Sequence, residues 1–163
     1  MSAASSVPNR ELLRHTIATL AYRGGKVIRG APASFSSFRV NDGSRTAGQI
    51  LAHMGDLLDW AASCARGAEA WRDSPPASWD ADAARFFDGL RALDALIAAG
   101  APLGCREEQL FQGPIADALT HVGQLAMMRR LAGTPIRGEN YMRAEIVAGR
   151  VGAEQTAPRR EFE

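Results

Sequence analysis

Lysine, histidine and cysteine are all scarce in this chain of 163 residues. Lys26 is the only lysine, the arginines are scattered along the sequence, and the formal net charge is +1. Nucleic-acid binding requires clustered positive charge, so this balance predicts a protein that does not bind nucleic acid. The two cysteines, Cys64 and Cys105, are too few for a disulfide framework and are expected to be reduced thiols.

Long apolar runs are also missing from the sequence. No stretch approaches the roughly 18 uncharged apolar residues that a membrane span requires, and the first ten residues lack the apolar core of a secretory signal. These absences predict a cytoplasmic protein with no membrane partner. Because 46% of the residues are apolar and 23% are charged, we expect residues 1–163 to form a single domain with its own hydrophobic core.

What the sequence does contain is helical periodicity. Apolar residues recur at helical spacing in four segments, at about residues 9–29, 46–66, 78–99 and 113–131. Thr46 and Gln49 form the pattern of a capping box, and Gly113-Pro114 is typical of a helix start. Strand patterns are not evident. The sequence therefore predicts an all-α fold, a four-helix bundle with long crossover connections, whose helical core spans about residues 9–133.

Two further features refine this expectation. Gly24-Gly25 interrupts the first helix, which predicts a close helix contact or a kink there. In the connection that follows, Phe35, Phe38 and Val40 predict packing against the helices. The C-terminal segment, residues 134–163, loses periodicity and is expected to have a frayed end.

The candidate functional residues are histidines and an aspartate. The chain has three histidines, of which His15 falls opposite the apolar stripe of the first helix and is expected at the surface. His53 lies inside an apolar stripe, where an aliphatic residue would be usual. Asp117 and His121 are four residues apart, a spacing that places two side chains on one helix face, roughly 5–6 Å apart at Cβ.

Each of these residues also has an ordinary structural interpretation. His53 could be a core histidine bonded to a carbonyl or to Asp56, because a buried imidazole needs a partner. Asp117 could interact with the helix dipole and accept a hydrogen bond from His121. If the three side chains converge instead, two imidazoles and a carboxylate would make an open three-ligand metal site.

Two segments resemble a known family. Residues 46–60, TAGQILAHMGDLLDW, are similar to the second-helix signature of the DinB-like (DinB/YfiT) superfamily of four-helix-bundle proteins. Residues 115–133, IADALTHVGQLAMMRRLAG, resemble its later ligand-bearing helix. The resemblance implies that His53 and His121 bind a divalent metal. In that family a third histidine usually stands at the position held here by Asp117, which keeps the capacity to act as an oxygen ligand.

The resemblance also suggests a function. It implies a metal-dependent enzyme that acts on a small molecule, with zinc, nickel or iron as the metal: a hydrolase, or an S-transferase that uses a low-molecular-weight thiol. No catalytic residue besides the ligands is identified. Around the ligands we expect four supporting or pocket-lining residues: Asp56, Trp60, Gln124 and Tyr141. The alternative is a non-catalytic binding or scaffold protein with a degenerate metal site, and a homodimer is compatible with either interpretation.

Overall fold

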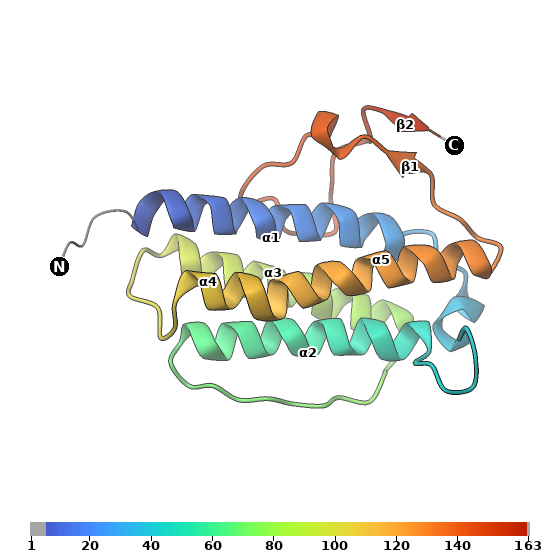
Figure 1. The fold of residues 1–163 in the computed structure, drawn as a ribbon, viewed down its shortest axis with the longest axis horizontal. Coiled ribbons are helices and arrows are strands. Elements are labelled where there is room, and N and C mark those ends of the chain that lie inside the picture. Colours follow the sequence, from blue (N-terminus) through green and yellow to red (C-terminus); the bar gives the residue numbers. More distant parts are fainter. Residues whose placement is uncertain (1–5, 163) are drawn as a thin grey trace.

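The computed structural model describes residues 6–162, and within that range the chain is mostly helical. Four long helical stretches lie side by side (Figure 1). They are α1 (Ser6–Ile28), α2 (Ala47–Ala65), α3 (Trp79–Ala98), and α4 (Glu107–Leu110) continued through a π turn (Phe111–Ile115) into α5 (Ala116–Leu131). This confirms the all-α prediction. None of these helices is both long enough and apolar enough to cross a membrane.

The helices do not simply alternate in direction along the chain. In Figure 1, α1 and α5 run one way while α2 and α3 run the other way. Because α2 and α3 are parallel, the chain must cross back along the helices between them, and residues 66–78 make that crossing as an extended segment. As a result α2 packs most extensively against α3, and its other side faces α5.

The local signals in the sequence explain where the helices begin and end. Thr46 and Gln49 form the predicted capping box at the start of α2. Ser78 caps α3, whose end is followed by Gly100 with a positive φ of 73°, a conformation that favours glycine. The first helix begins earlier than its predicted start at Asn9, since Asn9 already lies inside α1.

The core fills the space between the helices with the residues that the periodicity indicated. The predicted stripes of α2 and α3 are buried, among them Met54, Leu58, Phe86 and Leu90. At Gly24 of α1, the nearest atom to the position of an added Cβ would be Phe86 Cζ, at only 2.7 Å. The glycine pair therefore provides the close helix contact that the sequence predicted.

The last long helix starts earlier than predicted. The sequence suggested a start at Gly113-Pro114, but the helix begins at Glu107, and Pro114 lies within the π turn. Proline has no N–H, and its ring clashes with the carbonyl four residues earlier in a regular α-helix. A wider π turn relieves that clash, so the helix continues past the proline instead of starting there.

The C-terminal segment is folded onto α1. Gly138–Glu139 (β1) and Glu161–Phe162 (β2) form a short antiparallel pair, and a 3₁₀ turn (Tyr141–Arg143) follows β1. The buried carboxylate of Glu139 accepts hydrogen bonds from Tyr22 Oη at 2.7 Å and from Lys26 Nζ at 2.7 Å. The predicted frayed end is therefore wrong as far as Phe162, because polar contacts that periodicity does not reveal attach the segment to α1.

Candidate metal centre

The three predicted ligand residues meet between α2 and α5. His53 comes from the middle of α2, while Asp117 and His121 come from the first two turns of α5. One possible ligand atom from each residue can be chosen so that all three atoms lie within 4.8 Å of one another. We call these residues the ligand cluster. The side chains of His53 and His121 are 14% and 11% exposed, whereas that of Asp117 is 47% exposed, so the cluster is open on its aspartate side.

The distances in the ligand cluster are longer than those of direct hydrogen bonds. Nε2 of His53 lies 3.6 Å from Oδ2 of Asp117, and Nε2 of His121 lies 3.5 Å from Oδ1. Both separations exceed the usual N–H···O range of about 2.7–3.2 Å. They are close to the edge of a tetrahedron around zinc, roughly 3.4 Å for ligand bonds of about 2.1 Å. The spacing is therefore compatible with a cation shared by the three side chains.

His121 is held in a defined orientation. Its Nδ1 lies 2.7 Å from Oε1 of Gln124, one turn further along α5. Because that oxygen accepts, Nδ1 carries the proton and Nε2 presents its lone pair toward Asp117. A partner of this kind fixes the ring and increases its basicity as a ligand. Gln124 thus occupies the supporting position that the sequence suggested.

His53 has a different environment. Its Nδ1 is buried and has no hydrogen-bond partner among the described residues. The ring of Trp71 packs edge-on against its imidazole with centroids 5.7 Å apart, and the ring of His121 lies perpendicular to it at 4.9 Å. Burial, followed by the positive charge of Arg45 and by His121, lowers the pKa of His53 below its usual value. The imidazole is therefore neutral at neutral pH, the form that ligates metals.

Asp117 is positioned by the π turn. Ala118 and Val122, its neighbours on α5, are buried, so Asp117 lies at the edge of the apolar stripe, as its helical position indicated. The turn that accommodates Pro114 ends one residue before α5 begins and two residues before Asp117. Turns of this kind are frequent at functional sites because they change the direction in which the following side chains point.

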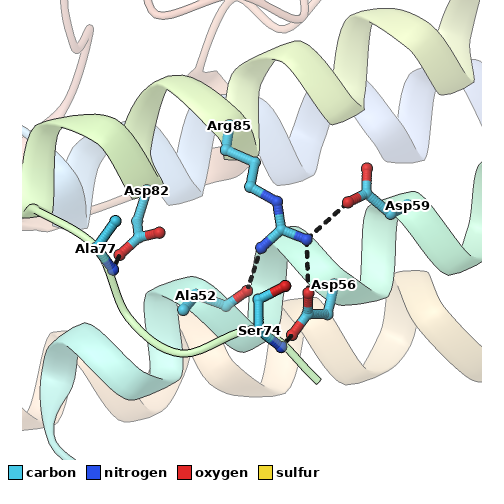
Figure 2. Close-up of polar contacts among 7 residues, drawn as sticks. All are labelled: Ala52, Asp56, Asp59, Ser74, Ala77, Asp82 and Arg85. Atoms are coloured by element: carbon cyan, nitrogen blue, oxygen red, sulfur yellow. Dashed lines mark hydrogen bonds and ion pairs between the residues drawn. The ribbon is translucent and has the colours of Figure 1, made fainter. Parts of the chain in front are cut away.

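Asp56 does not support the ligand cluster. Arg85 Nη2 of α3 donates to its Oδ1 at 2.5 Å, and the Ser74 N–H donates to its Oδ2 at 2.9 Å (Figure 2). Arg85 also donates to Oδ2 of Asp59 at 2.6 Å and to the carbonyl oxygen of Ala52 at 3.2 Å. The expectation that Asp56 orients an imidazole is therefore wrong. Its place in the sequence is close to His53, but its partners belong to α3 and to the connection.

Two other expected pocket residues lie away from the ligands. Trp60 donates from Nε1 to Oε1 of Glu69 at 3.1 Å and lines a separate cavity of about 390 Å³ together with both cysteines. Its link to the ligand cluster is indirect, through Trp71, whose ring centroid lies 5.9 Å away. Tyr141 packs against α1, with its ring 6.2 Å from that of Tyr22. The expectation that Tyr141 lines the metal pocket is therefore wrong.

Sequence reasoning missed two neighbours of the ligand cluster, Trp71 and Arg45. Trp71 belongs to the crossing segment, and Arg45 directly precedes the cap of α2. Arg45 lines a cavity of about 430 Å³, which His121 and Gln124 also line. Both residues lie in polar connections, and periodicity does not predict the path of a connection in space.

Comparisons with known proteins add no identification. No protein-family model, no curated protein and no solved structure matches this chain.

Proposed function

We propose that this protein is a divalent-metal-dependent enzyme that acts on a small molecule, and that its helices form a four-helix bundle of the DinB-like type. The observation that carries the proposal is the ligand cluster, with two Nε2 atoms 3.5–3.6 Å from the oxygens of one carboxylate. The motifs around His53 and His121 that resemble the DinB-like superfamily support the same interpretation.

The donor set fits a divalent cation. Two neutral imidazoles and one carboxylate are a known ligand combination for zinc and for non-haem iron, and imidazole also suits nickel. The Nδ1 of His53 is buried without a partner among the described residues, so no side chain orients this imidazole as Gln124 orients that of His121. A carboxylate ligand cancels one positive charge, so we expect weaker Lewis acidity than three imidazoles would give.

The residues around the cluster leave room for a substrate. His53, Asp117 and His121 approach from two helices, and the exposed side of Asp117 faces solvent. Gln124 orients one imidazole, and Trp71 restricts the other. A bound metal would lower the pKa of a thiol or a water molecule, which is the chemistry required for S-transfer or hydrolysis.

A separate general base is not evident near the cluster. Asp56 is bound to Arg85, and Glu139 is bound to Tyr22 and Lys26 on α1. Neither carboxylate is free to take a proton from a substrate at the ligand cluster. We therefore assign binding and orientation to the chain's own residues and assign no proton transfer to a side chain.

Metal stoichiometry tests the proposal directly. Untagged wild-type protein is expected to hold close to one divalent ion per chain, and His53→Ala and His121→Ala are each expected to lose it. Asp117→Ala tests the third ligand. His15→Ala is the matched control, because His15 is an exposed histidine of α1 and should leave metal content unchanged. Equal, substoichiometric metal in all of these proteins would instead support a non-catalytic scaffold.

Activity is the second part of the test. Metal-loaded and chelator-treated protein would be assayed for transfer of a low-molecular-weight thiol to an aryl halide and for hydrolysis of a nitrophenyl ester. We expect one of these rates to depend on metal and to be lost in His121→Ala. Stoichiometric metal without either activity would retain the metal site and reject these two reaction classes.

A further inference from the structure

The cavity beside the ligand cluster combines an apolar lining with one positive charge. Val40, Ile50, Met127 and Met128 supply the apolar surface, and Arg45 supplies the positive charge. Its volume of about 430 Å³ falls within the range of small-molecule sites, roughly 300–1,000 Å³. We call it the Arg45 cavity. His121 and Gln124 line this cavity and also belong to the metal centre. A molecule bound in the cavity would therefore contact these two residues.

Arg45 is available for a ligand. It is exposed and takes part in none of the ion pairs formed by the described side chains. Arg85 and Arg14, by contrast, are held by acidic partners, Arg85 by Asp56 and Arg14 by Asp94 at 2.9 Å. Arg45 and His121 of the ligand cluster line the same cavity.

The exposure of apolar side chains around the cavity also favours a bound ligand. Val40 and Met127 are 55% and 58% exposed although both line it. Methionine side chains adapt to ligands of irregular shape. Water is a poor partner for this lining, whereas the apolar part of a small molecule would cover it and gain the free energy of burial.

We propose that the Arg45 cavity binds the substrate of the metal centre, and that this substrate is a small carboxylic acid with an apolar body. Arg45 would hold the carboxylate through charge-assisted hydrogen bonds, and the four apolar residues would contact the body. This inference rests on the proposed function in that it names the substrate class of the same centre. Arg45 would act as a specificity-determining residue and take no part in metal ligation.

Charge complementarity supports an anion over a neutral or cationic ligand. A divalent ion on two neutral imidazoles and one carboxylate leaves a local charge of about +1, to which Arg45 adds a second positive charge. No acidic side chain lines the cavity among the described residues, and Asp56 and Asp59 of α2 are neutralised by Arg85. A carboxylate is therefore attracted from both sides of the cavity.

Calorimetric titration with phenylbutyrate and its neutral amide, phenylbutyramide, tests this inference. In the zinc-loaded wild type we expect the acid to bind about tenfold tighter than the amide, the effect of a hydrogen bond to a charged group. The Arg45→Gln variant should lose the preference. Arg39→Gln is the matched control, because Arg39 is exposed in the same connection but does not line the cavity. Added salt should reduce the preference, since Arg45 is exposed to solvent.

The same titrations in metal-free protein separate this inference from the proposed function. In metal-free protein the preference for phenylbutyrate over its amide should be smaller, and it should still disappear in the Arg45→Gln variant. If zinc does not bind but the preference for the acid still depends on Arg45, the proposed metal-dependent function is rejected and the proposal for the Arg45 cavity stands. If the preference exists only with zinc and survives Arg45→Gln, the metal holds the carboxylate and the Arg45 proposal is overturned. Failure of the wild type to bind phenylbutyrate at millimolar concentration would also overturn it.

Discussion

Two clusters of polar side chains on α2 differ in how completely the protein satisfies them. One is the Arg85 network, formed by Asp56, Asp59, Arg85 and the backbone of Ala52 and Ser74 (Figure 2). Its contacts are 2.5–3.2 Å long and occupy both oxygens of Asp56. In the ligand cluster the corresponding separations are 3.5 and 3.6 Å, and one buried nitrogen has no partner among the described residues. The protein's own groups satisfy the Arg85 network, which stabilises the fold, whereas the wider spacing of the ligand cluster leaves room for the proposed metal ion.

The electrostatics of Asp56 agree with a structural role. Burial opposes its ionisation, but the hydrogen bonds from Arg85 and Ser74 outweigh burial and lower the pKa of the carboxyl group. A carboxyl group with a lowered folded-state pKa stabilises the protein above its unfolded pKa of about 4 and loses that contribution as the pH falls through the folded value. The Arg85 network should therefore weaken only in acid.

The largest predicted effect on stability belongs to this network. Asp56→Ala would leave the Arg85 guanidinium and the Ser74 N–H without their acceptor, and we expect the free energy of unfolding to fall by about 3 kcal/mol. Urea denaturation at pH 7 measures the loss. Asp59→Ala is the control: it removes an exposed partner of the same arginine and should cost less than about 1 kcal/mol. Lost zinc in Asp56→Ala protein that remains folded would contradict the separation of the two clusters.

The next prediction concerns the supporting residue of the ligand cluster. Gln124→Ala should weaken zinc binding about 10- to 100-fold, because His121 loses the acceptor that fixes its ring. Gln124→Glu should retain tight binding, since a carboxylate also accepts from Nδ1–H. Competition with a zinc-binding dye measures both affinities. Thr120→Ala, an exposed change on the same helix, should have no effect. Equal affinity of Gln124→Ala and the wild type would mean that the ring is oriented by packing alone.

The sequence predicted the ligands better than their surroundings. Helical spacing placed Asp117 and His121 on one face, and the resemblance to the DinB-like superfamily joined His53 to them; the three side chains do lie together. Asp56 could not be interpreted in the same way. Its spacing of three from His53 was visible, but Arg85, its actual partner, belongs to another helix at a position that periodicity does not relate to α2.

Connections limited the prediction in other places. Trp71 and Arg45 lie near the ligands because of the paths of two irregular segments, and Tyr141 moves to α1 with the C-terminal segment. The start of the last helix was misplaced because proline is common at the first turn and rare inside a helix, whereas here a π turn accommodates it. Irregular backbone depends on contacts between distant residues, which local patterns do not contain.

A third prediction concerns the C-terminal segment, where the carboxylate of Glu139, like that of Asp56 in the Arg85 network, has hydrogen-bond partners. Burial and then the hydrogen bond to Glu139 raise the pKa of Tyr22. Burial opposes the charge on Lys26, but its bonds to Glu139 and Glu161 outweigh burial, so its pKa is raised too. Groups with raised folded-state pKa values stabilise fully below their unfolded values of about 10 and lose this contribution as the pH rises through the folded values.

The contact of Glu139 with α1 should therefore weaken in alkali. We expect the free energy of unfolding of the wild type to fall by about 1 kcal/mol or more between pH 9 and pH 11. Tyr22→Phe should show a shallower fall, because a phenylalanine cannot ionise. Guanidinium denaturation at stepped pH measures both curves. Arg137, which pairs with Glu161 across a longer 3.7 Å, offers Arg137→Gln as a control that keeps the wild-type slope. Identical slopes for Tyr22→Phe and the wild type would show that Tyr22 does not carry the effect.

The smallest effect on stability is expected for His53→Ala in metal-free protein, where the ligand cluster can be compared directly with the Arg85 network. His53→Ala removes a buried nitrogen that has no partner among the described residues, so the relief of its desolvation offsets lost packing. The free energy of unfolding should then change by less than about 1 kcal/mol. With zinc the wild type should become clearly more stable than the variant, because a ligand at a hundred times its dissociation constant stabilises the protein that binds it by about 2.7 kcal/mol. His53→Ala should gain nothing. A metal-free loss as large as that of Asp56→Ala would mean that His53 is a structural core residue and that the two clusters do not differ in kind.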